Sequence, residues 1–233
     1  MRVIFILGVN FLRTQWIVVL VMLAYVAGVN SFLAWNVQPD EVLVFLRIQG
    51  IYAMSFVLLT AVPAIHTERK SRRILAVLSK GIERWQYLGG LLCGCAMISA
   101  IFCVAVGLAA FLGASRAGMA VTGLVELLLL VFLACLTAAS VGLFCAAFLH
   151  PMLAAGAATA ILALPVMGRM HGWSLPPVLF PVAEVARRVM EFRFTTPGAD
   201  DWTVAAAALA QVVIFWAAAA AVFARRDVTT SSE

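Results

Sequence analysis

The side chains that can bind a charged partner gather in one part of this sequence, which we name the charged segment (residues 66–87). It holds six of the sixteen Lys and Arg residues of the chain, although only 12% of all residues are charged. Long apolar runs lie on both sides of it. Guanidinium and ammonium groups at this density attract anionic lipid headgroups or an acidic protein surface. The charged segment is therefore the first candidate for a binding role.

Within the charged segment, the sequence predicts an amphipathic helix at Glu68–Ser79. Thr67 is suited to be its N-cap, Glu68 to complement the helix dipole, and Gly81 to follow its end. The apolar side chains share one face and the basic ones lie largely on the other: Ile74, Leu75, Val77 and Leu78 against Arg69, Lys70, Arg72 and Arg73. On helix chemistry alone two interpretations stay open. One is an anchor at the lipid headgroups, and the other is a docking helix for a soluble partner.

Two ionisable residues, Arg47 and Glu126, lie inside apolar runs. Each is about six residues from the expected outer end of its run, a depth of roughly 9 Å at about 1.5 Å per residue. A lone charge at this depth in lipid costs at least several kcal/mol. Similar depth and opposite charge therefore predict an ion pair. Both a structural pair and a polar element at the outer mouth of a substrate path fit this pattern.

The sequence lacks the motifs of common catalytic and metal sites, so no catalytic, cofactor-binding or metal residue is predicted. It contains no H-E-x-x-H motif and no G-x-S-x-G motif. The three histidines, His66, His150 and His171, fall on two different expected sides of the membrane and predict no common metal site. Disulfides are not expected, because all five cysteines lie inside apolar runs. Gly90-x-x-x-Gly94 predicts close helix packing.

The composition indicates an integral membrane protein. Hydrophobic residues make up 64% of the chain and the mean hydropathy is +1.06, whereas soluble domains contain roughly 45–50% apolar residues. Continuous apolar runs longer than about 18 residues favour helical spans over a β-barrel. The sequence therefore predicts one all-α membrane domain over residues 1–233. Its six predicted spans are Trp16–Trp35, Val42–Ile65, Tyr87–Leu112, Ala120–Leu149, Met152–Val166 and Val204–Ala224.

The distribution of Lys and Arg predicts the orientation of the chain. Ten of these residues fall on the side that holds both termini and five on the other, so both termini are expected to be cytoplasmic. The net charge of +5 is assigned to this asymmetry, and no nucleic-acid partner is expected. Residues 1–14 are expected to form a retained interfacial helix rather than a cleaved signal peptide, because Arg13 interrupts the apolar run.

The connection at residues 168–202 is the only sizeable segment expected outside the membrane on the outer side. Its prolines and its polar pattern predict short helices that lie on the outer surface or dip into it. Two opposite-charge pairs at i,i+4 spacing, Glu184–Arg188 and Arg187–Glu191, would each stabilise such a helix by about 0.2–0.5 kcal/mol.

The order of residues in the charged segment resembles a known signature. It runs Glu68-Arg69, a basic patch, Ile74-Leu75-Ala76-Val77-Leu78-Ser79, then Arg84 and Tyr87 before Gly89-Gly90-Leu91-Leu92. This order is similar to that of the permease subunits of type-2 ABC exporters. The interfacial helix, the six spans and the outer helices extend the resemblance over most of the chain. The sequence departs from the family pattern where Arg72-Arg73 replace Gly-Thr, Gly81 replaces Pro and Leu91 replaces Lys.

The resemblance implies a non-catalytic permease subunit with a cytoplasmic coupling region at residues 66–86, in a bacterial or archaeal plasma membrane. In this family a separate ABC ATPase, present in two copies, binds the coupling helix and holds ATP and Mg²⁺. The permease pairs with a second copy or a paralogue and contacts membrane lipid. The chain itself has no phosphate-binding loop, because neither lysine lies in a Gly-Lys-Ser/Thr sequence. The residues implied to couple to the ATPase are Glu68, Arg69, Arg72, Arg73, Leu75, Leu78 and Arg84.

Three other functions stay open from the sequence. A haem-exporter-type ABC permease of cytochrome c maturation has a similar length and number of spans. A secondary transporter would more often show inverted repeats and broken helices, which are not evident. An intramembrane enzyme would have to use Glu184, Glu191 or His171 at the outer surface, and the two glutamates lack the paired spacing of membrane proteases. The sequence does not identify the substrate.

Overall fold

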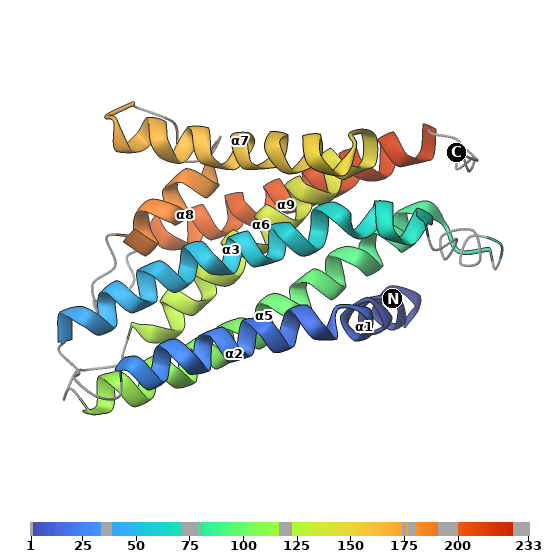
Figure 1. The fold of residues 1–233 in the computed structure, drawn as a ribbon. Helices are drawn as coiled ribbons and strands as arrows, with labels where there is room; N and C mark the ends of the chain where they lie inside the picture. The colour runs from blue at the N-terminus through green and yellow to red at the C-terminus, as the bar shows by residue number, and fades with distance from the viewer. Residues whose placement is uncertain are drawn as a thin grey trace.

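The structure, a computed structural model, describes residues 2–33, 39–70, 79, 81–116, 123–173, 176, 180–190 and 200–225. These residues are helical apart from short turns, and no strand occurs among them. The predicted all-α fold is thus confirmed (Figure 1). The helices are α1 (Arg2–Thr14), α2 (Trp16–Leu33), α3 (Pro39–Lys70), α5 (Arg84–Arg116), α6 (Leu124–Phe148), α7 (Pro151–Met170), α8 (Pro181–Met190) and α9 (Asp200–Arg225).

Several of these helices are long and apolar enough to cross a membrane. Five meet this condition singly, namely α3, α5, α6, α7 and α9, and each coincides with a predicted span. The first predicted span coincides with α2, which is bent by 66° relative to α1; the two helices together would add a sixth span. This pattern is consistent with a multi-pass membrane protein.

The central helix of the bundle is α6. It packs against α3, α5, α7, α8 and α9, and most of its side chains are buried. Small residues let α3 approach it closely: a Cβ atom added at Gly142 would lie 3.0 Å from Leu58 Cδ1 and 3.3 Å from Ala61 Cβ. Since lipid provides no hydrophobic driving force between helices, such close packing is a main source of helix association in membranes.

The bundle has two ends that hold different elements (Figure 1). The α1 end holds α1, the last turns of α3 and α9, the start of α5 and the turn between α6 and α7. The opposite end, which we name the α8 end, holds α8 and the first turns of α3, α6 and α9. The two flanks of the charged segment therefore lie together at the α1 end.

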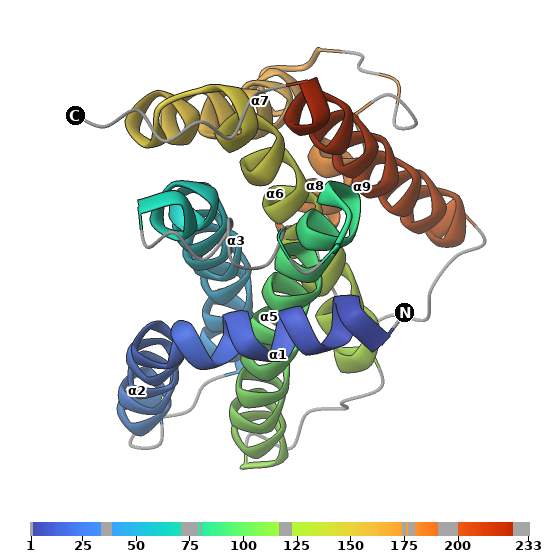
Figure 2. The ribbon, with the colours of Figure 1, turned by 90° about the vertical axis from the view of Figure 1, so that its right-hand side faces the viewer.

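The first helix, α1, lies across α5 (Figure 2). Glycines on α5 permit this contact, because a Cβ atom added at Gly90 would lie 2.5 Å from Leu7 Cβ, and one at Gly94 would lie 2.5 Å from Phe11 Cδ1. The predicted close packing at these two glycines is confirmed, and the partner helix is α1. Phe11 is buried in the contact, whereas Phe5 is exposed.

The structure corrects one prediction about the charged segment. α3 continues without a break to Lys70, so Thr67 lies inside its last turns and is not the N-cap of a separate helix. The last two turns of α3 contain neither Gly nor Pro, and a change from apolar to polar side chains does not end a helix. Residues 71–78, most of the predicted helix at Glu68–Ser79, lie outside the described residues.

Candidate functional site

The structure describes the two flanks of the predicted coupling region. Glu68 is half-buried in the last turn of α3, Arg69 follows it on the same turn, and Arg84 is the first residue of α5. Four residues assigned to coupling lie outside the described residues: Arg72, Arg73, Leu75 and Leu78. The site geometry is therefore that of the end of α3 and the start of α5.

Arg84 joins the start of α5 to the end of α9. Its Nη1 atom donates hydrogen bonds to two backbone carbonyls, Phe223 O at 2.9 Å and Ala224 O at 2.7 Å. The last carbonyls of a helix have no partner within the helix and carry a partial negative charge. A guanidinium group satisfies and neutralises them. The sequence assigned Arg84 to a partner protein and gave no sign of this contact.

Two aromatic contacts strengthen the same connection. Tyr87 stacks on Phe223 with ring centroids 6.2 Å apart, and Trp85 meets Trp216 edge-on at 6.1 Å. Tyr87 and Phe223 are almost fully buried. Aromatic pairs of this kind contribute about 0.5–1.5 kcal/mol beyond the burial of their surface. We name the contact between residues 84–87 and residues 216–224 the α5–α9 junction.

The first helix contacts the α5–α9 junction as well. A Cβ atom added at Gly89 would lie 3.4 Å from Ile4 Cδ1 on α1 and 3.6 Å from Trp216 Nε1 on α9. The closer α1 contacts lie at the next residue, Gly90, and about one turn further along α5, at Gly94. Three helices, α1, α5 and α9, thus meet where the charged segment rejoins the bundle.

At the α8 end, the side chain of Glu184 is buried and ion-paired. It accepts hydrogen bonds from Arg187 at 2.5 and 3.1 Å and from Arg188 at 3.3 Å. The hydrogen bonds from Arg187 are the main reason that the pKa of the Glu184 carboxyl lies below its ordinary value, although burial acts in the opposite direction. The predicted Glu184–Arg188 pair is confirmed, and Glu191 lies outside the described residues.

Arg47 on α3 and Glu126 on α6 are both half-buried at the α8 end. Their helices meet nearby, where a Cβ atom added at Gly50 would lie 3.0 Å from Val189 Cγ1 on α8 and 3.4 Å from Val131 Cγ2 on α6. Within the described part of the chain, no ion pair joins Arg47 to Glu126. The Oε2 atom of Glu126 is buried and has no hydrogen-bond partner among those residues. The ion pair predicted between Arg47 and Glu126 is therefore not observed among the described residues.

Gln49 is a buried polar side chain that the sequence reasoning missed. It lies on α3 and is 1% exposed; its side chain interacts with that of Tyr25 on α2, but its Nε2 and Oε1 atoms form no hydrogen bond of ordinary geometry with the described residues. Burying an amide without a hydrogen bond costs about 1–3 kcal/mol in proteins. Such groups are normally satisfied by water or by a ligand. The only signal in the sequence was one amide inside an apolar run.

The histidines are divided between the two ends of the bundle. The rings of His66 and His150 meet at the α1 end, and His171 follows α7 toward the α8 end. No group of three or more metal-binding side chains occurs in the described ranges. All five cysteines are free thiols.

No protein-family model matches this chain, and no curated protein matches it. In the described part of the chain, the fold is that of a helical protein with five or six segments long and apolar enough to cross a membrane. The residues that bear on a more particular function lie at the α1 end and the α8 end.

Proposed function

We propose that this chain is the permease subunit of an ATP-driven exporter of the type-2 ABC kind. In this proposal it crosses the plasma membrane six times, with both termini and the charged segment in the cytoplasm. It pairs with a second copy or a paralogue, and two ATPase subunits hold ATP and Mg²⁺ and drive the pair. The observation that carries the proposal is the α5–α9 junction, which fixes the exit of the charged segment to the last span.

The two flanks of the charged segment support the proposal because they connect it to several helices at once. α3 enters the segment as one continuous helix, and its Leu58 and Ala61 pack on α6 at Gly142. α5 leaves the segment already bonded to α9 through Arg84. A partner that displaces the segment would therefore move α3, α5 and α9 relative to α6. A helix that served only as a lipid anchor would not require these connections to the other helices.

The α8 end supports the proposal by placing polar groups inside the bundle. Gln49 and Glu126 bury polar atoms in the bundle, and the Oε2 atom of Glu126 has no hydrogen-bond partner in the described part of the chain. Glu184 and Arg188 lie on α8, which packs on α3 and α6. Ionisable and polar groups inside membrane bundles mark substrate and ion pathways. In this proposal these groups, together with Arg47, line the outer part of the substrate path.

The proposal is tested by co-purification: a tagged copy of this chain, isolated from its native membranes, should retain an ABC ATPase. Reversal of Arg72 and Arg73 to Glu should abolish association with the ATPase, because it reverses the charge of the docking surface. Leu75→Pro should uncouple hydrolysis from transport, since proline inside a helix costs about 3 kcal/mol. The matched control is reversal of Arg2 and Arg13, two exposed arginines on α1, which makes the same change in charge.

The outcomes separate the permease from a lipid-anchored helix. Loss of the ATPase with the Arg72 and Arg73 reversals, but not with the control, supports docking. Retention of a stoichiometric, transport-coupled ATPase in all these variants would show that the proposal is wrong. Cysteine labelling at Ser71 and Ser174, in a background without native cysteines, should show opposite sidedness. Labelling of Ser71 from outside the cell would contradict the proposed orientation.

A further inference from the structure

Two histidines from different elements meet at the α1 end. His66 lies near the end of α3, and His150 lies in the turn between α6 and α7. Their ring centroids are 5.7 Å apart, and the ring planes are inclined at 65°. Both side chains are exposed. The pair belongs to no group of three metal-binding side chains in the described ranges, and the proposed coupling does not use it.

The backbone holds both histidines in place. His66 is part of the continuous helix α3. His150 stands between the end of α6 and Pro151, the first residue of α7, and its carbonyl accepts a hydrogen bond from Ala154 N at 2.8 Å. Proline at the first helical position is pre-organised for this geometry. The orientations of the two rings therefore depend only on rotations about their side-chain bonds.

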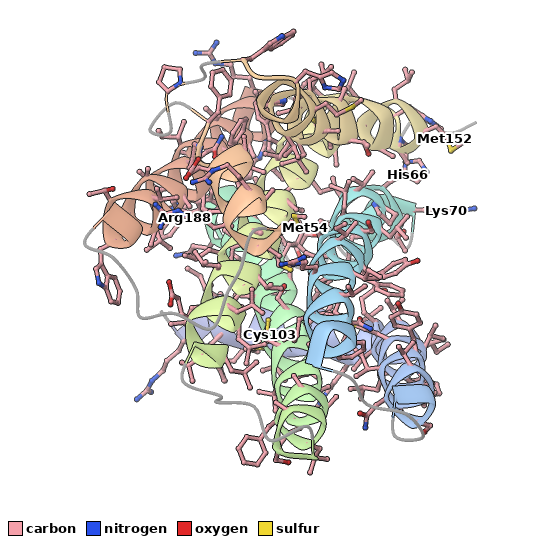
Figure 3. The ribbon with its side chains drawn as sticks, turned by 90° about the vertical axis from the view of Figure 1, so that its left-hand side faces the viewer. Met54, His66, Lys70, Cys103, Met152 and Arg188 are labelled. Carbon is pink, nitrogen blue, oxygen red and sulfur yellow. The ribbon has the colours of Figure 1, made fainter. Side chains whose placement is uncertain are left out.

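The separation of the rings suits a shared metal ion. Two imidazole nitrogens at about 2.0–2.1 Å from one ion place their ring centres roughly 5–6 Å apart, which includes the observed 5.7 Å. Imidazole is a good ligand for zinc, copper and nickel. Met152, which is 79% exposed, lies close by where the start of α7 approaches the end of α3 (Figure 3). Its thioether and water can complete the coordination of a soft ion.

We propose that His66 and His150 form a two-imidazole site for a divalent transition-metal ion. The ion would join the end of α3 to the turn between α6 and α7. Because α3 leads directly into the charged segment, a bound ion would restrain one flank of that segment. This binding site goes beyond the proposed exporter function and does not depend on it.

Zinc titration of the full chain in nanodiscs, purified with a histidine-free tag, tests the site. Loss of a partner outside the metal shell already lowers affinity about 10–100-fold, so His66→Ala and His150→Ala should each weaken Zn²⁺ binding at least that much. The double variant should be no weaker than either single variant, because one imidazole alone does not chelate. The matched control is His171→Ala, which should bind Zn²⁺ as the wild type does. His171 lies toward the other end, with Nδ1 at 2.8 Å from Met167 O.

A spectroscopic measurement and a folding measurement complete the test. Cu²⁺ bound to the wild type should show coupling to two imidazole nitrogens by electron paramagnetic resonance, and each single variant should lose that signal. Unchanged melting temperatures should accompany these losses, since both rings are exposed. Wild-type Zn²⁺ affinity in both single variants, or an equal loss in His171→Ala, would overturn the proposal and leave only an aromatic contact between the rings.

Discussion

Replacement of Arg84 by Gln should loosen the end of α9. The change removes the charged hydrogen bonds to the carbonyls of Phe223 and Ala224, of which the first is part-buried and the second exposed. A hydrogen bond to a charged group contributes about 1.5–3 kcal/mol, but water replaces an exposed one at much smaller cost. We therefore expect a loss of about 1–2 kcal/mol at this helix end, a factor of about 5–30 in its local opening.

Hydrogen exchange of the full chain in nanodiscs, read by mass spectrometry, measures this loss. Peptides that cover residues 216–225 should exchange faster in Arg84→Gln, while peptides from the central α6 should not change. Arg84→Lys should be intermediate, because an ammonium group keeps the charge without the forked geometry of arginine. Arg13→Gln, an exposed change on α1, is the control. Exchange of the α9 peptides within about twofold of wild type in Arg84→Gln would refute the role given to Arg84.

Three other predictions concern different parts of the bundle. Gly94→Ala should lower the melting temperature, because the new Cβ would lie 2.5 Å from Phe11 Cδ1 and 3.1 Å from Gly8 O, and overpacking costs about 1–3 kcal/mol. The control is Gly156→Ala, since nothing lies within 4 Å of the Cβ atom added there. Equal melting temperatures of the two variants would contradict the α1–α5 contact. The lowered pKa of Glu184 means that its contribution to stability is present above the ordinary glutamate pKa of about 4.3 and is lost as the pH falls below that value toward the folded pKa. Glu184→Gln should remove this acid dependence from a melting-temperature profile, and an unchanged profile would show that the ion pair contributes nothing. A double-mutant cycle between Arg47 and Glu126 should give a coupling below about 0.5 kcal/mol, because no ion pair joins them in the described ranges; a larger value would restore the pair.

The sequence predicted the features that depend on neighbouring residues. The fourth and fifth predicted spans, Ala120–Leu149 and Met152–Val166, left only two residues between them, and α6 ends at Phe148 just before α7 begins at Pro151. The i,i+4 spacing of Glu184 and Arg188 predicted a pair that forms at 3.3 Å. These features follow from helix geometry alone, since residues four apart lie on the same face.

Other features depend on contacts between distant residues, and local patterns carried no signal for them. Arg84 and Phe223 are 139 residues apart in the chain, and only the packing of α5 on α9 brings them together. The glycines of α5 predicted a close contact but not that α1 makes it, because any helix face with a fitting side chain satisfies the pattern. The N-cap at Thr67 was wrong because the membrane boundary was read as a helix end. Polarity changes at that boundary, but the backbone continues to Lys70.

The two flanks of the charged segment are attached to different helices of the bundle. A movement of the segment can therefore reach the bundle by two routes, through the α3 flank or through the α5 flank. The α3 flank packs on α6 at Gly142, and its His66 faces His150 in the turn that follows α6. The α5 flank is bonded to α9 through Arg84 and contacts α1. A metal ion at the two histidines would hold α3 against α6 and leave the α5–α9 junction free to move. Arg84→Gln would act on the other flank, because it weakens the α5–α9 junction and leaves the α3 contacts intact. If a partner drives the bundle through both flanks, zinc and Arg84→Gln should each reduce transport in part, and together they should reduce it more than either alone.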